Sequence, residues 1–240
     1  MCGRFTLTTT DRPALGLRFG VEVGPGLDST LGRFNAAPGQ EVLAVRQREG
    51  GPREALAARW GLVPAWAEDL NSGYRMINAR SETVRESRAY GSLVARAESR
   101  CLIPADGFFE WMEAASGGGP KRPVRFTVDA GSPFSMAGLI ARREWEGREL
   151  VSCTILTTDA DEAVAPVHDR MPVILCGADE EEAWISRELS AREMDELTTP
   201  LEAKRVWSRM ASPFLNRVGA VTEGPELLDP DWSGPDTLFG

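Results

Sequence analysis

The sequence is poor in the residues from which metal and disulfide sites are built. It has one histidine, His168, and four cysteines among 240 residues, and no two cysteines form a Cys-x-x-Cys pair. A zinc site needs three or four such ligands, so no metal and no cofactor is expected. Cys101, Cys153 and Cys176 lie in apolar runs and are predicted to be reduced core residues.

Long apolar segments are also missing. No run of about 18 apolar residues occurs, so no membrane-spanning helix is expected. The N-terminus shows no basic segment followed by an apolar one, which argues against a secretory signal and predicts a cytoplasmic protein. Glycine-rich phosphate loops are absent as well, so neither a Walker site nor a dinucleotide site is predicted.

Lysine is scarce, because only Lys121 and Lys204 stand among the 27 basic residues. The net charge of −9 argues against general nucleic-acid binding. The charge is uneven, however: residues 1–100 hold 14 arginines and 11 acidic residues, which leaves −12 for residues 101–240. Arginine binds phosphate through two hydrogen bonds and stacks on bases, although genome composition explains an arginine bias equally well.

Short apolar segments alternate with glycine and proline, which is typical of one α+β domain with a mainly antiparallel sheet. A hairpin tip is predicted at Ser116–Gly119. Residues 1–222 are expected to form the catalytic domain, and 223–240 a tail rich in proline, glycine and acids that wraps the surface or frays. The predicted strands are Glu41–Arg46, Arg100–Ile103, Arg125–Val128, Phe134–Ile140, Leu150–Thr157 and Val173–Leu175; the predicted helices are Asp11–Phe19, Ser87–Glu98, Asp179–Ile185 and Ala191–Thr198.

Cys2 is the most informative residue, since removal of Met1 would leave it with a free α-amine. Such an aminothiol condenses with an aldehyde to an imine, and the thiol then closes a thiazolidine ring. Alternatively, the thiol is a nucleophile whose own amine acts as its base. Both chemistries require the loss of Met1.

Three further segments carry candidate chemistry. Glu110 lies among aromatic residues, where burial would raise its pKa and suit it to acid–base work, although it could equally pair with an arginine at a strand end. His168 is either a general acid or a capping residue. Asn78 and Arg80 would share one face of a strand, as an amide and a phosphate ligand, or else belong to a surface turn.

Tryptophans are concentrated near these segments, at positions such as Trp66 and Trp111. Most of them are expected in the core, but those beside a proline-bent loop could stack on bases.

The motifs in order resemble the SOS response-associated peptidase (SRAP) family over nearly the whole chain. They are Cys-Gly-Arg-Phe at the start, Arg-Phe-Asn-Ala-Ala-Pro, Trp-Gly-Leu-Val-Pro-Ala-Trp, Ile-Asn-Ala-Arg-Ser-Glu-Thr, Pro-Ala-Asp-Gly-Phe-Phe-Glu-Trp and His-Asp-Arg-Met-Pro-Val. The resemblance implies a single domain with a β-barrel-like core flanked by helices. It also implies a DNA-damage protein that senses abasic sites in single-stranded DNA and captures them covalently, as a monomer associated with the nucleoid when bound.

The resemblance also assigns roles to residues. Cys2 would be the nucleophile, Asn78 the residue that holds it, Glu110 the acid–base group and His168 the acid that acts on the sugar. A basic groove is expected from residues 1–100 together with Arg170. The groove residues it implies are Arg4, Arg80, Arg170, Trp66 and Trp111.

Two alternatives to abasic-site capture, with any accompanying lyase activity, remain open from the sequence. One is an N-terminal-nucleophile peptidase or amidohydrolase, including one that acts on its own leader. The other is a module that binds single-stranded DNA without covalent chemistry.

Overall fold

The N-terminal strand lies inside a sheet rather than at its edge. The computed structural model describes residues 2–113, 118–217 and 223–234, and Met1 lies outside these ranges. One sheet has the strand order β13-β8-β7-β1-β2, with antiparallel neighbours throughout. Its strands are β1 (Arg4–Leu7), β2 (Arg33–Ala36), β7 (Gly107–Met112), β8 (Arg122–Val128) and β13 (Val206–Met210).

The second sheet closes into a barrel. Its order is β11-β10-β4-β3-β6-β9-β12, and β10 also pairs with β9, which closes the ring of β10, β4, β3, β6 and β9. Since β4 and the short β5 run parallel to β10 while the other pairs are antiparallel, the barrel is mixed. The strands are β3 (Glu41–Gln47), β4 (Arg53–Trp60), β5 (Asn78–Arg80), β6 (Arg100–Ala105), β9 (Phe134–Trp145), β10 (Arg148–Asp159), β11 (Arg170–Pro172) and β12 (Ile174–Leu175).

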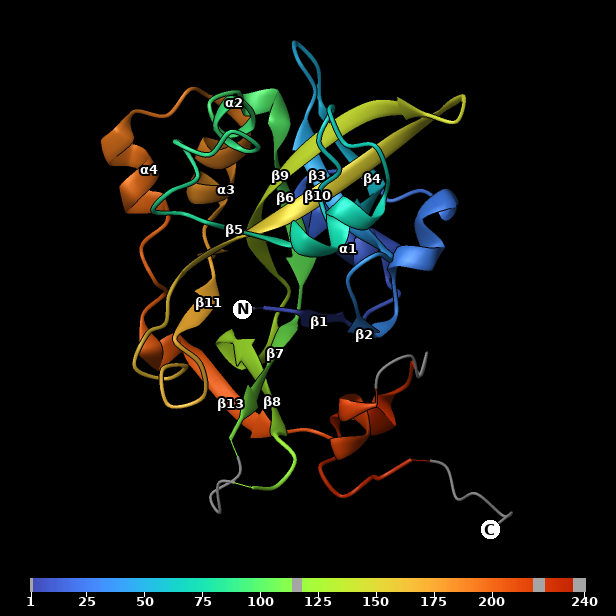
Figure 1. The fold of residues 1–240 in the computed structure, drawn as a ribbon, viewed down its shortest axis with the longest axis vertical. Coiled ribbons are helices and arrows are strands. Elements are labelled where there is room, and N and C mark those ends of the chain that lie inside the picture. The colour runs from blue at the N-terminus through green and yellow to red at the C-terminus, as the bar shows by residue number, and fades with distance from the viewer. Residues whose placement is uncertain (1, 114–117, 218–222, 235–240) are drawn as a thin grey trace.

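Most of β3, β6 and β10 and the first part of β9 are buried on both faces, which explains their apolar runs, whereas β4 is largely only partly buried. In β3, Val42 and Ala44 join a core that also contains Cys2 and residues of the first sheet. Leu43 and Val45 point the other way, into a core that the helices cover. Figure 1 shows the barrel above β7, β8 and β13, with β1 between the two parts. The expected α+β fold with a barrel-like core is confirmed.

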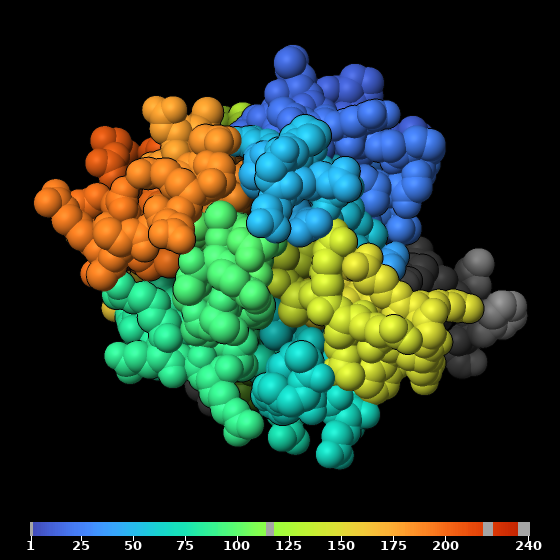
Figure 2. Space-filling model, turned by 90° about the horizontal axis from the view of Figure 1, so that it is seen from above, coloured from blue at the N-terminus to red at the C-terminus, as the bar shows by residue number. Residues whose placement is uncertain are grey.

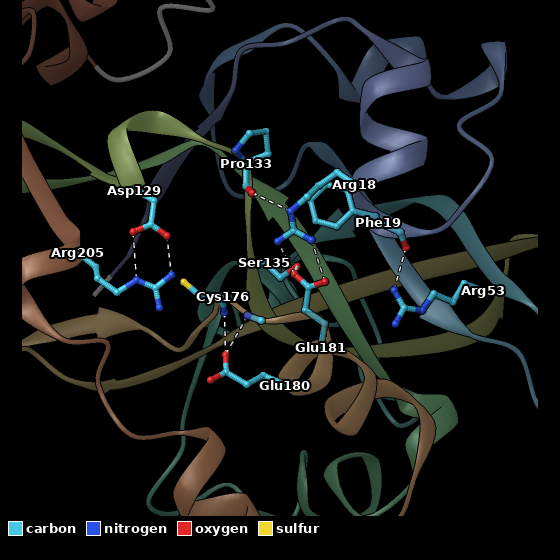
Figure 3. Close-up of polar contacts among 11 residues, drawn as sticks. Arg18, Phe19, Arg53, Asp129, Pro133, Ser135, Cys176, Glu180, Glu181 and Arg205 are labelled. Carbon is cyan, nitrogen blue, oxygen red and sulfur yellow. Dashed lines mark hydrogen bonds and ion pairs between the residues drawn. The ribbon is translucent and has the colours of Figure 1, made fainter.

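The helices lie around the barrel and are tied to it by buried polar contacts. Glu181 of α3 receives two hydrogen bonds from Arg18 of α1 and one from Ser135 of β9 (Figure 3). The helices are α1 (Arg12–Phe19), α2 (Gly91–Val94), α3 (Ala178–Ser186) and α4 (Ala191–Leu197). Short 3₁₀ segments are η1 (Pro25–Thr30), η2 (Asn71–Arg75), η3 (Ala97–Ser99), η4 (Asp129–Gly131), η5 (Ala203–Arg205), η6 (Pro213–Asn216) and η7 (Pro225–Leu228).

One predicted helix is wrong. The interval from Ser87 to Glu98 contains a single helical turn, α2, instead of a continuous helix. The Ser87 hydroxyl accepts a hydrogen bond from the Ala89 amide, which favours a local turn. Gly91 also packs against backbone, since a Cβ there would lie 2.5 Å from the Arg85 carbonyl oxygen.

Three further expectations concern the cysteines, the hairpin tip and the C-terminal tail. Cys101 and Cys153 are buried and unpaired as predicted, whereas Cys176 is only partly buried. The predicted hairpin joins β7 and β8, although 114–117 lie outside the described residues. Residues 223–234 of the predicted tail wrap the surface: Leu227 is fully buried beside Phe109.

Candidate active site

Cys2 is held just before β1, where its backbone is fixed from a distant strand. Its carbonyl oxygen accepts a hydrogen bond from Asn78 Nδ2 at 2.8 Å. Asn78 begins β5, which pairs with β10, so the amide is presented by the wall of the barrel. Asn78 Oδ1 is buried and finds no hydrogen-bond donor among the described residues, which leaves an acceptor beside the start of the chain. The side chain of Cys2 is completely buried.

Burial also sets the chemistry of the Cys2 thiol. Removal from solvent raises its pKa well above the ordinary value, and the negative charge of Glu110 adds to the effect. A thiol with a raised pKa is a poor thiolate nucleophile. The site therefore favours chemistry in which the thiol reacts late, after a nearby base can take its proton.

Glu110 is such a base. It lies on β7, and only 3% of the residue is exposed. Burial raises its pKa to about 7, so near neutral pH the carboxyl group exists in both protonation states. Glu110 can therefore both donate and accept a proton, which is the requirement for acid–base work in a reaction with several proton transfers.

His168 completes the group. Its Nε2 lies 4.0 Å from Glu110 Oε2, and its Nδ1 accepts a hydrogen bond of 2.9 Å from the Arg170 amide. That bond places the proton of the neutral ring on Nε2, facing Glu110. Burial lowers the pKa of His168, which favours the neutral form. Asp169 Oδ1 lies 2.9 Å from Nδ1 and would stabilise a protonated ring. The structure thus brings together all four residues predicted as catalytic.

The predicted groove arginines differ in their surroundings. Arg80 is exposed, whereas Arg4 donates a 2.6 Å hydrogen bond to Asn35 Oδ1. Arg170 is buried: its Nη1 and Nη2 bind both carboxylate oxygens of Glu82, and Nη1 also binds Asp159. A phosphate could reach Arg170 only by displacing one of these carboxylates. In this structure Arg170 therefore positions His168: its side chain is held by Glu82 and Asp159, and its amide donates to His168 Nδ1.

The two predicted tryptophans, Trp66 and Trp111, also lie in different surroundings. Trp111 follows Glu110 and so points to the opposite face of β7, where its Nε1 donates to Asn216 Oδ1 at 2.8 Å. That contact explains why Trp111 packs under the C-terminal segment. Trp66 is 58% exposed, and the guanidinium of Arg88 lies 5.9 Å from the centre of its ring.

Sequence reasoning missed the residue that holds the Trp66 loop in place. Arg143 of β9 donates hydrogen bonds to the carbonyls of Pro64 and Ala67 at 2.8 and 2.9 Å. No motif signalled this role, because the arginine is nearly 80 residues away in sequence. The loop borders a cleft of about 380 Å³, also lined by Arg88. Figure 2 shows the hollow between the segments coloured light blue, teal, green and yellow.

The fold and site together define a class: α+β barrel proteins with a candidate reactive cysteine at position 2, beside an amide, a buried carboxyl and an imidazole. A family model described as SOS response associated peptidase (SRAP) matches residues 1–218. The chain belongs to the SRAP family, which confirms the resemblance seen in its motifs.

Several named relatives cover most of the chain. It is 36% identical over 234 residues to the abasic site processing protein YoaM of Bacillus subtilis (strain 168), with 95% of this chain and 98% of the relative covered. It is 31% identical over 239 residues to the abasic site processing protein YedK of Escherichia coli (strain K12), covering 96% and 100%.

Solved structures confirm the fold. A Bacteroides thetaiotaomicron protein has a TM-score of 0.81 at 23% identity, with 95% of this chain and 99% of that chain covered. A Bordetella bronchiseptica protein has a TM-score of 0.72 at 26% identity, covering 88% and 100%. Among the described residues, no helix is long and apolar enough to cross a membrane, and no group of ligand side chains could hold a metal ion.

Proposed function

We propose that this protein processes abasic sites in single-stranded DNA by capturing the sugar aldehyde with Cys2 after Met1 is removed. The observation that carries the proposal is the convergence of Asn78, Glu110 and His168 on the start of the chain. The names of YoaM and YedK support the same substrate.

The reaction begins with the α-amine. An α-amino group has a pKa of about 7.7–8.0, so roughly a fifth to a third of it is neutral near pH 7.4 and little activation is needed. Asn78 Nδ2 donates to the Cys2 carbonyl oxygen, and its Oδ1, which has no donor among the described residues, is the acceptor that we assign to that amine. In its protonated form, which Asp169 would stabilise, His168 can donate its Nε2 proton to the ring oxygen of the closed sugar and return to the neutral ring. The anomeric hydroxyl gives up its proton to water, and the open aldehyde is favoured. Positioning is the main contribution of the protein to this step.

The amine adds to the aldehyde carbon, and Glu110 supplies the proton with which water leaves the carbinolamine. The product is an imine between Cys2 and the sugar. The nitrogen of this imine carries a proton, because water left from the protonated carbinolamine. Glu110, now ionised, then takes the thiol proton as the sulfur adds to the imine carbon, and the nitrogen keeps its proton as a neutral amine. The product is a five-membered thiazolidine, and the only net loss is one water molecule. Ring closure removes the imine that would otherwise lead to β-elimination and strand cleavage.

The amide-hydrolysis alternative is less well supported by the electrostatics. An N-terminal-nucleophile hydrolase needs its thiolate in the first step, whereas burial raises the pKa of the Cys2 thiol. Capture uses the amine first and the thiol second, which suits this environment better.

The test is a denaturing gel of protein incubated with an abasic single-stranded oligonucleotide, after intact mass has shown that Met1 is absent. Wild type should give a heat-stable shifted band, and Cys2→Ala should give none. Cys2→Ser should give a band only after borohydride reduction, because the imine forms but the sulfur ring cannot. Cys176→Ser, which changes a partly exposed cysteine outside the site, should behave as wild type.

Two outcomes would refute capture. A stable band with Cys2→Ala would place the chemistry elsewhere. Binding to the oligonucleotide that never becomes covalent in Met1-free wild type would favour the non-covalent DNA-binding module.

A further inference from the structure

A groove lies on the face of the five-stranded sheet that points away from Glu110. It has a volume of about 340 Å³ and runs over β8 and β13. Trp207 is paired across the strands with Thr127, and Arg209 with Arg125, so all four side chains share one face. We call this surface the outer groove; its lining includes Arg125, Thr127, Ala130, Gly131, Trp207 and Arg209.

The outer groove carries two arginines in a chain whose net charge is −9. Its lining includes Arg125 and Arg209 and no acidic side chain. Arg209 is exposed and makes no hydrogen bond or ion pair with the described residues. Arg125 uses Nε and Nη2 to bind Thr6 and Asp106, and the Asp106 carboxylate balances its charge, so the unbalanced positive charge of the groove is that of Arg209. The charge of the groove therefore complements an anion.

An aromatic surface lies beside this charge. Trp207 is 61% exposed, although it stands on a strand of the sheet and not on a loop. An exposed indole next to an unengaged guanidinium offers a stacking face and a phosphate contact, the two features by which proteins hold single-stranded nucleic acid. An acidic peptide would match the arginines but would leave the indole unused.

The walls of the outer groove are fixed before any ligand arrives. Asp129 and Ala130 of η4 both have left-handed backbone conformations, with φ of 45° and 62°, which non-glycine residues rarely adopt. The Asp129 carboxylate is held at both oxygens by Arg205, the residue immediately before β13 (Figure 3). This ion pair ties one wall of the groove to the strand that carries Trp207.

We propose that the outer groove binds a nucleotide of single-stranded DNA outside the covalent site, with its base on Trp207 and its phosphate at Arg209. The choice of DNA as partner rests on the proposed function; the location of the groove does not. Glu110 and Arg125 point to opposite faces of the sheet, because Glu110 pairs with Val124 on the buried side. A strand that reaches both surfaces would pass around the edge of the sheet, so contact with the groove should depend on oligonucleotide length.

The test compares binding and capture in the same variants. Fluorescence anisotropy with labelled dT20 that has no abasic site should show Trp207→Ala binding at least about fivefold more weakly than wild type. Arg209→Ala should reduce the slope of log affinity against log salt by about 0.7, the value for one lost phosphate contact on a single strand. Leu17→Ala and Arg148→Ala, which remove an exposed apolar and an exposed basic side chain elsewhere, should leave both quantities unchanged.

Capture of a five-nucleotide abasic oligomer should be the same in the Trp207→Ala Arg209→Ala double variant as in wild type, since so short a strand occupies only the covalent site. Failure of wild type to capture this oligomer would count against the proposed function alone. Unchanged dT20 affinity in the double variant would overturn the outer groove as a DNA site. A second result would also overturn it: an octaglutamate peptide that binds wild type more tightly than dT20 does, and that displaces dT20 from wild type but not from the double variant. The groove would then be a site for acidic peptides.

Photocrosslinking gives a second readout that does not depend on folding of a variant. An oligonucleotide of 20 residues containing 5-iodouracil should crosslink to the tryptic peptide 206–209, which contains Trp207. Crosslinks confined to peptides from the Cys2 site would contradict the proposal.

Discussion

Replacing Glu110 by glutamine should slow capture and, at the same time, stabilise the protein above neutral pH. Burial raises the pKa of Glu110 from 4.5 to about 7. The folded protein therefore holds this proton more tightly than the unfolded chain does. The contribution of Glu110 to stability is greatest below pH 4.5, falls as the pH rises from 4.5 to about 7, and then levels off.

The size of the effect follows from the shift. A shift of about 2.5 units corresponds to roughly 3 kcal/mol, at 1.36 kcal/mol for each unit. Glutamine cannot ionise, so Glu110→Gln should gain about that much over wild type between pH 4.5 and about pH 8. The same variant should capture abasic DNA about 10²- to 10⁴-fold more slowly, the usual loss when an acid–base group is removed.

Urea unfolding, followed by tryptophan fluorescence at a series of pH values, measures the first effect; single-turnover capture measures the second. Glu113→Gln is the matched control, because Glu113 is an exposed glutamate close by on the chain, where burial costs nothing. A stability difference between Glu110→Gln and wild type that stays constant with pH, or that shrinks as pH rises, would show that burial does not control this carboxyl group.

Three further predictions concern the framework of the site. Gly61→Ala should lower the free energy of unfolding by about 1–3 kcal/mol, since φ is +121° and a Cβ would lie 2.6 Å from the Gly73 carbonyl oxygen; Gly24→Ala, which meets no neighbour, is the control in the same urea experiment. Arg143→Ala should cost about 1–3 kcal/mol through two lost hydrogen bonds to carbonyls and should also weaken oligonucleotide binding measured by anisotropy. Arg170→Met should slow capture in the gel assay and lower the free energy of unfolding by about 1–3 kcal/mol. The loss is smaller than for a fully buried ion pair, because both partner carboxylates, Glu82 and Asp159, are partly exposed.

The sequence predicted four of the five barrel strands, β3, β6, β9 and β10, because each contains a short apolar run. It missed β4, where charged residues such as Arg53, Glu54 and Arg59 interrupt the apolar pattern. The strand predicted at Phe134–Ile140 continues to Trp145 in the structure. Its last five residues alternate between partly buried and exposed, and they extend as a hairpin with β10. The helix predicted at Ser87–Glu98 failed for a local reason. Its hydrophobic pattern is satisfied by a series of turns, and a close backbone contact at Gly91 leaves room for only one helical turn.

The sequence identified the residues of the site but not how they are arranged in space. Cys2, Asn78, Glu110 and His168 could be named because each stands in a motif, yet their convergence depends on strand pairing that no local pattern encodes. The contacts of Arg170 could not be predicted from its motif. The motif suggests a phosphate ligand, whereas the fold places carboxylates from two other segments against its guanidinium.

The place of β1 has a consequence for biosynthesis. β1 is made well before its partner β7, which begins at Gly107, so this pairing must wait for about a hundred further residues, although β2 at Arg33–Ala36 can pair with β1 earlier. At about 5–20 residues per second, that interval is on the order of 5–20 s. During this time the edge of β1 that later faces β7 is unpaired, so Cys2 would be accessible to a peptidase that removes Met1. For capture to proceed as proposed, N-terminal processing therefore has to finish before β7 pairs with β1 and the Cys2 side chain becomes buried.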